Sequence, residues 1–286
     1  MRAEDVSKVG VVGAGIMGSG IVEVCARAGM EVTFVEATDD LVARGRGAIE
    51  RSTARAVEKG KLDSEGRDAL LGRVRGATSL DEVAGSDLVI EAVVEDLGIK
   101  QDVFRRLDGL TRPEVVLASN TSSIPIVELG GVTKRPERVV GMHFFNPPPI
   151  MPLLELVRSL ATSDETVAFA RAVGERLGKT TVLAKDRAGF IVNYLLVPYL
   201  NFAAGMYEEG FATAEDIDAA IHLGLNHPMG PLTLLDFIGI DTAVHVADVL
   251  YEEFKDPLFS PPPVLKRMLA AGWLGRKTGR GFYTYA

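Results

Sequence analysis

The stretch GVVGAGIMGSG, residues 10–20, limits the possible fold more than any other part of the sequence. Its glycines form the pattern G-x-G-x-x-G directly after the apolar run KVGVVG. In this pattern the first glycine permits a tight turn, the second lets a ligand approach the backbone, and the third allows close packing of helix on strand. We therefore predict a strand, a turn that binds a dinucleotide pyrophosphate, and a helix whose free N–H groups favour that anion. The predicted contacts are Gly13, Ala14, Gly15, Ile16, Met17 and Gly18.

An acidic residue ends the next predicted strand, EVTFVE at residues 31–36. A carboxylate at the position of Glu36 can accept hydrogen bonds from ribose hydroxyls, and it repels a 2′-phosphate. We therefore predict NAD(H) as the cofactor rather than NADP(H). The alternative is a structural glycine turn with a solvated glutamate, which the order of strand, turn, helix, strand and acid disfavours.

Apolar runs alternate with helical patterns through the first two thirds of the chain. Runs rich in Val and Ile occur at residues 87–94, 114–120, 138–145 and 180–186. They show no polar alternation, which is typical of a parallel sheet with helices on both faces. Residues 39–72 interrupt this rhythm with a charged helical pattern and a turn signal at EKGK. We predict that they form a helical hairpin inserted after the second strand.

The chain changes character after residue 186, where the patterns become helical. A long helix is predicted over residues 190–209, and a second helix begins at Thr213 with Asp216 three residues later, as in a capping box. More helix follows to about Phe254, and no strand pattern appears before GFYTYA. The predicted fold class is therefore α/β. It comprises a Rossmann-type doubly wound sheet with the inserted hairpin (residues 1–186) and an all-α C-terminal domain (residues 187–286).

Composition excludes several classes of function. The net charge of −8 argues against nucleic acid as a main partner, since phosphate binding requires surplus Lys and Arg. The single cysteine, Cys25, excludes an internal disulfide, and we predict no metal site. The longest apolar stretch, residues 191–206, is too short to span a bilayer, and residues 1–9 lack the pattern of a signal peptide. We expect a soluble cytoplasmic protein that does not bind membranes.

A histidine and a glutamate stand out in MHFFNPPPIMPLLELV, residues 142–157. His143 falls at the carboxyl end of a predicted strand, the edge of a parallel sheet at which ligands bind. Glu155 lies in an apolar run, where an ionised carboxylate is costly unless it is paired. A chain reversal at the prolines would place Glu155 beside His143, and the carboxylate would then orient the imidazole as a general base. Their spacing alone supports a catalytic pair and an internal hydrogen-bonded pair without a catalytic role equally well. The neighbouring dinucleotide site favours the catalytic pair.

Several motifs in one order make the chain resemble a known family. GVVGAGIMGSG, EAVVEDLGIK, ASNTSS, HFFNP, GFIVN, PMGP and KTGRGFY occur in sequence over nearly the whole chain. This set resembles the L-3-hydroxyacyl-CoA dehydrogenases, and among them most of all the stand-alone bacterial 3-hydroxybutyryl-CoA dehydrogenases. Two positions depart from the pattern. Tyr194 stands where relatives often carry Arg, and Pro152 stands where many carry a basic residue.

The resemblance implies roles for individual residues. His143 corresponds to the catalytic base and Glu155 to the carboxylate that orients it. Ser122 corresponds to the hydroxyl that hydrogen-bonds the reacting oxygen, and Asn193 to the amide that holds the substrate. Without the resemblance, a polar residue at a helix interface would be the better interpretation of Asn193. The implied further cofactor contacts are Glu95, Lys100, Ser122, Asn146 and Lys277.

The resemblance also implies a function for the predicted hairpin, which contacts CoA in the family. Ser52 and Lys59 match positions that contact CoA, so they are predicted substrate contacts together with Ser122 and Asn193. Further cations on the same element would add a positive field for an anionic thioester carrier, and the alternative for each is an ordinary charged helix face. These cations are Arg44, Arg46, Arg51, Arg55 and Lys61.

Together these features predict reversible, NAD-dependent oxidation of a (3S)-3-hydroxyacyl-CoA, with 3-hydroxybutyryl-CoA as the expected substrate. One alternative is a related dehydrogenase of a non-CoA hydroxy acid, such as the crystallin-like gulonate dehydrogenases, and the cations of residues 44–61 disfavour it. Another is a catalytically silent nucleotide-binding protein, which would not need the buried pair of His143 and Glu155. The predicted long helix is apolar on several faces, which favours a homodimer through the C-terminal domain.

Overall fold

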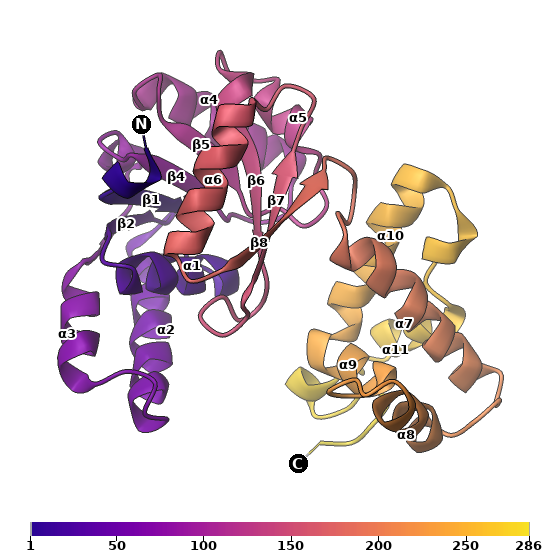
Figure 1. Cartoon of the computed structure of the whole chain (residues 1–286). Helices are drawn as coiled ribbons and strands as arrows, with labels where there is room; N and C mark the ends of the chain where they lie inside the picture. Colours follow the sequence, from indigo (N-terminus) through magenta and orange to yellow (C-terminus); the bar gives the residue numbers. More distant parts are fainter. Residues whose placement is uncertain (1, 286) are drawn as a thin grey trace. The chain divides into compact units, whose positions relative to one another are not determined.

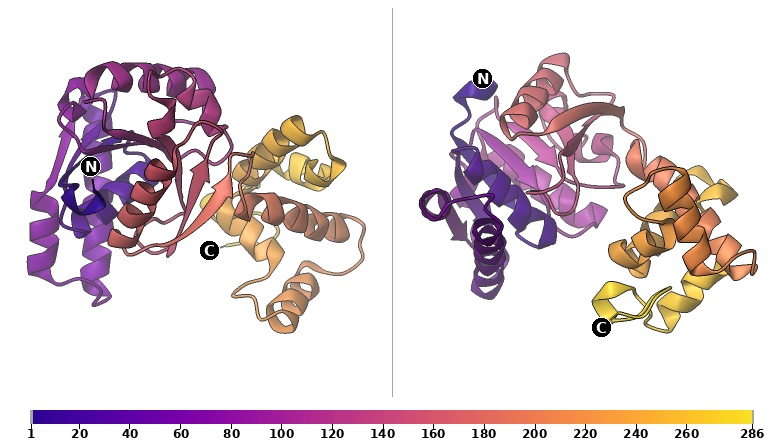
Figure 2. Two further views of the ribbon diagram at one scale, coloured as in Figure 1. Left: turned by 45° about the horizontal axis from the view of Figure 1, so that its top comes forward. Right: turned by 60° about the horizontal axis from the view of Figure 1, so that its bottom comes forward.

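The computed structural model describes residues 2–285, and the chain divides into two compact units (Figure 1). The first unit spans Met1–Arg187 and the second Ala188–Ala286. The first contains the β-sheet, and the second is helical (Figures 1 and 2). No helix within residues 2–285 is both long enough and apolar enough to cross a membrane.

An eight-stranded sheet forms the centre of the first unit, with the strand order β3-β2-β1-β4-β5-β6-β7-β8. Strands β3 to β6 in this order pair in parallel, β7 runs antiparallel to β6, and β8 runs parallel to β7. The predicted doubly wound α/β fold is confirmed. The strands are β1 Lys8–Val12, β2 Glu31–Val35, β3 Val74–Ala77, β4 Leu88–Glu91, β5 Val116–Ser119, β6 Val139–Phe144, β7 Leu153–Arg158 and β8 Thr180–Lys185.

Helices cover both faces of this sheet, which explains why its strands lack polar alternation. Ile21 of α1 and Val173 of α6 share one apolar cluster with Val11 and Ile90 of the strands, and α4 and α5 lie on the other face (Figure 1). Strand β3 was not predicted, because VRGA is short and lies at the sheet edge, where only Val74 is buried. The helices are α1 Ile16–Arg27, α2 Asp39–Glu58, α3 Ser64–Gly72, α4 Leu97–Leu110, α5 Ile126–Gly130 and α6 Asp164–Arg176.

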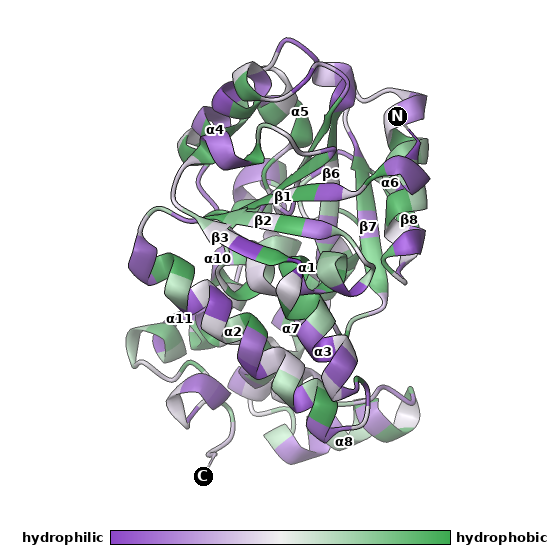
Figure 3. Cartoon of the chain, turned by 90° about the vertical axis from the view of Figure 1, so that its left-hand side faces the viewer, coloured by the Kyte–Doolittle hydropathy of each residue, from purple (hydrophilic) through white to green (hydrophobic). Residues whose placement is uncertain are grey.

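The predicted hairpin is formed by α2 and α3, which lie side by side (Figures 1 and 2). The Thr38 hydroxyl caps α2 by accepting a hydrogen bond from the Leu41 N–H, and the Asp63 carboxylate caps α3 in the same way. Both helices carry many hydrophilic residues (Figure 3). A Cβ at Gly45 would lie 2.8 Å from the Ala14 Cβ, so this glycine allows α2 to approach the turn after β1.

Five α-helices and two short 3₁₀-helices form the described part of the second unit and confirm the predicted helical C-terminal region. The Thr213 hydroxyl accepts a hydrogen bond from the Asp216 N–H at 3.1 Å, as the capping pattern predicts. Apart from two isolated bridges at Arg280, the described part of this unit contains no β-structure. Its main core joins Leu200, Leu232 and Leu265. The helices are α7 Val192–Glu208, α8 Ala214–Gly224, α9 Pro231–Ile238, α10 Ile240–Phe254 and α11 Pro263–Ala270.

Candidate active site

The glycine-rich turn joins β1 to α1 at the carboxyl edge of the sheet. Gly13 has a φ of +91°, and a Cβ there would lie 2.6 Å from the Ala92 carbonyl oxygen. A Cβ at Gly18 would lie 1.9 Å from the Gly13 carbonyl oxygen. A Cβ at Gly15, by contrast, would meet no other atom of residues 2–285 within 4 Å. The first and third glycines are thus required by packing, and the second leaves the backbone open to a pyrophosphate.

Glu36 follows β2 and lies against this turn. Its Oε1 atom accepts a hydrogen bond of 2.6 Å from the Ala14 N–H. The carboxylate is therefore held next to the glycine-rich turn, where a ribose would follow a bound pyrophosphate. Ile16, the first residue of α1, is 79% exposed at the same turn. These residues fit the adenosine half of a dinucleotide.

His143 and Glu155 face each other across β6 and β7. The antiparallel register pairs the two residues directly, and the His143 Nδ1 atom lies 2.8 Å from the Glu155 Oε2 atom. Their exposed fractions are 6% and 0%. A carboxylate accepts, so the Nδ1 atom carries the shared proton, and the neutral ring then has its lone pair on the Nε2 atom. This arrangement is suited to a general base.

Glu95 organises the turn that carries Ser122. Its Oε1 atom accepts hydrogen bonds from the Thr121 hydroxyl, the Ser122 N–H at 3.0 Å and the Ser123 N–H at 3.2 Å. Burial alone would raise the pKa of Glu95, but the Lys100 ammonium and these hydrogen bonds outweigh it and lower the pKa below the usual value. The carboxylate is thus ionised at neutral pH and fixes the Ser122 turn.

Lys100 is almost completely buried under Glu95. Its ammonium lies 2.7 Å from the Glu91 Oε1 atom and 3.2 Å from the Glu95 Oε2 atom, and its side chain is 1% exposed. The predicted cofactor contact by Glu95 is compatible with this placement. A direct contact by Lys100 stays a prediction that its burial disfavours.

The remaining predicted site residues lie on both units. Asn146 follows β6 and is exposed. Ser52 on α2 lines a hollow of about 120 Å³ between α1, α2 and Pro147–Pro149, and Lys59 is exposed at the end of α2. In the second unit, Asn193 lies in the first turn of α7. The Lys277 ammonium in that unit pairs with Asp241.

The cations of the hairpin differ in their surroundings. Arg44, Arg51 and Arg55 are exposed on α2, and Lys61 is exposed in the turn after it. The Arg46 guanidinium, however, donates to the Val74 carbonyl oxygen at 2.7 Å and to the Glu50 carboxylate at 3.1 Å. Arg46 therefore fastens α2 to the edge strand, whereas the sequence left open whether it adds to a positive field for CoA or belongs to an ordinary charged helix face.

Three polar residues that support this edge were not predicted from the sequence. The Asn120 Oδ1 atom accepts a hydrogen bond of 2.9 Å from the Phe144 N–H, next to His143. Glu91 and Ser119 end two neighbouring strands and are hydrogen-bonded to each other at 2.7 Å. The available signal was polar residues directly after apolar strands, in VIEAVVE and ASNTSS.

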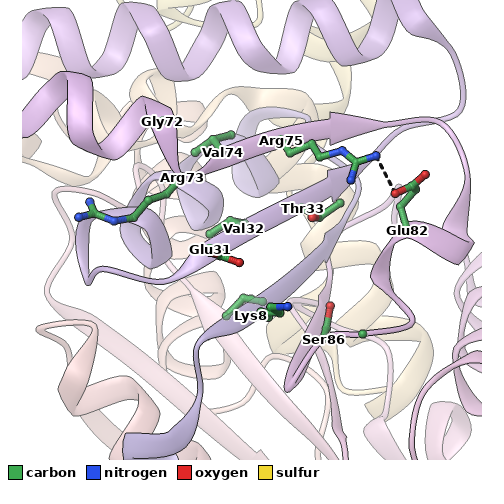
Figure 4. A pocket seen from close by; sticks show the side chains of 12 residues that line it. Lys8, Glu31, Val32, Thr33, Gly72, Arg73, Val74, Arg75, Glu82 and Ser86 are labelled. Atoms are coloured by element: carbon green, nitrogen blue, oxygen red, sulfur yellow. Dashed lines mark ion pairs between the residues drawn. The ribbon is translucent and has the colours of Figure 1, made fainter.

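A hollow of about 400 Å³ lies at the opposite, amino edge of the sheet (Figure 4). It is lined by charged residues of both signs at the starts of β1, β2 and β3, and Arg75 forms an ion pair of 2.8 Å with Glu82 there. None of the predicted site residues lines it. The candidate active site is therefore at the carboxyl edge.

Comparison with known proteins gives matches over nearly the full chain. The family model described as 3-hydroxyacyl-CoA dehydrogenase, NAD binding domain, matches residues 8–187, and the C-terminal domain model of that family matches residues 189–285. A 3-hydroxybutyryl-CoA dehydrogenase of Mycobacterium tuberculosis is 53% identical, over 99% of this chain and 100% of the relative. A probable 3-hydroxybutyryl-CoA dehydrogenase of Deinococcus radiodurans is 46% identical, over 97% and 100%. The crystal structure of (S)-3-hydroxybutyryl-CoA dehydrogenase from Ralstonia eutropha matches with a TM-score of 0.93 and 45% identity, over 99% and 100%.

Proposed function

The chain belongs to the 3-hydroxyacyl-CoA dehydrogenase family, and on that premise we propose that it interconverts (3S)-3-hydroxybutyryl-CoA and acetoacetyl-CoA with NAD(H). The observation that carries this proposal is the 2.8 Å contact between His143 and Glu155 at the carboxyl edge of the sheet. That edge also carries the glycine-rich turn and Glu36. A general base and a dinucleotide site are the two components that oxidation of an alcohol requires.

His143 acts as the general base in this proposal. Its Nε2 atom takes the proton of the substrate 3-hydroxyl as the C–H bond on the same carbon is broken. NAD⁺, when bound, supplies the hydride acceptor. The Glu155 carboxylate stabilises the imidazolium that forms, since it already accepts from the Nδ1 atom. In the reverse reaction His143 returns the proton as an acid.

Ser122 holds the reacting oxygen in this proposal. Its position is supported by Glu95, which accepts a hydrogen bond from the Ser122 N–H. A hydroxyl donor directed at the oxygen on which charge develops stabilises the transition state electrostatically. Asn193 is a proposed substrate contact because it matches the amide of the family motif GFIVN.

The hairpin would bind the CoA nucleotide. Ser52 and Lys59 are the proposed contacts, and the exposed Arg44, Arg51 and Arg55 supply a positive field around them. An acidic chain with a net charge of −8 needs such a local cluster to attract an anionic carrier. We assign residues 1–186 to cofactor binding, with the hairpin 39–72 for CoA, and residues 187–286 to substrate binding and dimerisation.

The substrate assignment is tested by initial rates with NADH and a pair of substrates. Acetoacetyl-CoA should support turnover, and free acetoacetate should not, because the hairpin has no nucleotide to bind. Equal rates with both would favour the alternative of a dehydrogenase for a non-CoA hydroxy acid. Repeating the assay with longer 3-ketoacyl-CoA substrates determines the preferred chain length.

Three further proposals concern cofactor, assembly and location. Glu36 would disfavour NADPH, and the ratio of kcat/KM for NADH and NADPH measures this preference. A homodimer through the helical unit stays a prediction that light scattering checks, and a monomer would contradict it. The cytoplasmic location stays a prediction as well.

A further inference from the structure

Two ionisable side chains beneath the Ser122 turn are almost completely buried, although the proposed mechanism uses neither of them as an acid or a base. Glu91 is 0% exposed and Lys100 is 1% exposed. Burying charges is costly unless they are paired and their hydrogen bonds are satisfied. Glu91 neither removes nor supplies a proton in the proposed reaction, so its presence in this position calls for another explanation.

A first chain of contacts leads from the Glu91 Oε1 atom to the Ser122 turn. This atom lies 2.7 Å from the Lys100 ammonium and also accepts a hydrogen bond of 2.6 Å from the Val93 N–H. The Lys100 ammonium in turn lies 3.2 Å from the Glu95 Oε2 atom. The other oxygen of Glu95 accepts the hydrogen bonds of the turn, including those from the Ser122 N–H at 3.0 Å and the Ser123 hydroxyl at 3.0 Å.

A second chain of contacts begins at the other oxygen of Glu91. The Ser119 hydroxyl donates to the Oε2 atom at 2.7 Å, and the Ser119 oxygen accepts a hydrogen bond of 3.2 Å from the Thr121 N–H. The backbone adds a third link, because the Asn120 N–H donates to the Glu91 carbonyl oxygen at 2.8 Å. Both oxygens of the Glu91 carboxylate are therefore connected, through neighbouring side chains, to the same four-residue segment, 120–123.

We propose that Glu91 is a positioning residue for Ser122. Its carboxylate holds Lys100 against Glu95 on one side and Ser119 under Thr121 on the other, and together these contacts fix the turn that presents the Ser122 hydroxyl. The inference rests on the proposed function, because it requires that Ser122 acts on the reacting oxygen. It adds a residue that touches neither the substrate nor the cofactor.

The hydrogen-bond donors around Glu91 explain why a carboxylate is needed at this position. Three donors converge on its two oxygens, namely the Lys100 ammonium, the Val93 N–H and the Ser119 hydroxyl. An amide offers one acceptor oxygen and places an N–H₂ group where the second acceptor was. It also leaves Lys100 with Glu95 as its single carboxylate partner. The isosteric substitution Glu91→Gln should therefore loosen the turn without a change of volume.

The test is a double-mutant cycle between Glu91→Gln and Ser122→Ala, with kcat measured at saturating NADH and acetoacetyl-CoA. Glu91→Gln alone should lower kcat about 10- to 100-fold, as expected for a displaced catalytic group. In the Ser122→Ala background the same substitution should lower kcat less than about 3-fold, because the hydroxyl that Glu91 positions is already absent. If the fold-loss of kcat in the double variant equals the product of the losses in the two single variants, the proposal is overturned.

Two further variants separate this inference from effects on stability. Ser119→Ala removes the second chain of contacts and keeps all charges, so it should lower kcat about 3- to 10-fold and provides the test if Glu91→Gln does not fold. Asp108→Asn is the matched control, because Asp108 forms a buried ion pair of 2.8 Å with Arg135 elsewhere in the first unit. It should lower the unfolding temperature and leave kcat unchanged.

The outcomes also distinguish the inference from the function on which it rests. If Ser122→Ala alone leaves kcat unchanged, the proposed role of Ser122 is wrong and Glu91 has nothing to position. If Ser122→Ala lowers kcat but neither Glu91→Gln nor Ser119→Ala does, the proposed function stands and the role of Glu91 is wrong. A loss of NADH affinity at unchanged saturating kcat would also overturn that role.

Discussion

The two units bury carboxylates in different ways. In the first unit Glu155 and Glu91, both on strands of the sheet, contact ionisable partners, the His143 imidazole and the Lys100 ammonium. In the second unit Asp236, 1% exposed, accepts hydrogen bonds from the Phe282 N–H, the Tyr283 N–H and the Tyr285 hydroxyl. The donors to Asp236 are neutral, and they belong to the C-terminal segment.

Asp218 repeats the pattern of the second unit. It accepts from the Leu232 N–H at 2.8 Å, from the Thr233 N–H at 2.8 Å and from the Tyr283 hydroxyl at 2.9 Å. A carboxylate saturated by neutral donors fixes a segment, whereas one paired with an imidazole can also support proton transfer. The comparison therefore assigns a role in proton transfer to Glu155, which is paired with an imidazole, and a purely structural role to Asp236 and Asp218.

The largest expected effect comes from removing the base itself. His143→Gln should lower kcat by roughly 10²- to 10⁴-fold, the usual contribution of a general base. NADH affinity and the unfolding temperature should change little, because glutamine can still donate to Glu155. Steady-state kinetics measure kcat, NADH fluorescence titration measures the affinity, and a thermal melt measures the unfolding temperature. Turnover near that of the parent protein would remove the catalytic assignment of His143.

The corresponding change in the second unit should affect stability. Asp236→Asn turns an N–H₂ group toward donors that need an acceptor, which should lower the free energy of unfolding by about 1–3 kcal/mol. Urea denaturation measures this change, and limited proteolysis should show earlier cleavage in residues 275–285. The control is Glu252→Gln, which removes an exposed ion pair with Lys255 and should change the free energy by less than about 0.5 kcal/mol. If Asp236→Asn and Glu252→Gln lowered the free energy of unfolding equally, Asp236 would not hold the C-terminal segment in place.

Acidification should weaken the ionised network of the first unit. The pKa of Glu95 is lowered in the folded protein, so its ionisation contributes stability that is present above its usual value near 4.5 and is lost as pH falls through the lower folded value. The difference in unfolding free energy between the parent protein and Glu95→Gln should therefore shrink as pH falls from about 6 to about 3. Urea denaturation across this range measures it. A difference independent of pH would show that Glu95 acts only through its shape.

The smallest expected effect concerns a single neutral donor. Tyr283→Phe removes the hydroxyl that donates to Asp218, which keeps its backbone donors, so the free energy of unfolding should fall by about 0.5–1.5 kcal/mol. Burial and the hydrogen bond to Asp218 raise the pKa of Tyr283, so this donor remains protonated throughout the neutral range. Thermal unfolding measures the loss. A drop in kcat/KM as large as that of His143→Gln would place Tyr283 in the active site.

Much of the fold could be predicted because it depends on local patterns. The glycine-rich turn, the capping by Thr213 and the apolar strands each follow from neighbouring residues, and the structure contains all of them. Strand β3 could not be predicted from such a pattern, because an edge strand buries only part of its surface. The sequence also could not decide the surroundings of Arg46, since a charged residue on a helix can face solvent or a neighbouring strand with the same sequence pattern.

The candidate site also has features that follow from the sequence and features that depend on the tertiary structure. The sequence by itself determined which residue types stand in the strands or directly after them, including His143, Glu155 and the Ser122 turn. The sequence also predicted that Glu155 lies beside His143, but only the tertiary structure fixed the geometry of that pair and the other contacts. The register of β6 against β7 sets His143 opposite Glu155, and the neighbouring ends of β4 and β5 bring Glu91 to Ser119. Partners so far apart in the chain meet only after the sheet has formed, because hydrogen bonds depend on distances in space and not on spacing along the sequence.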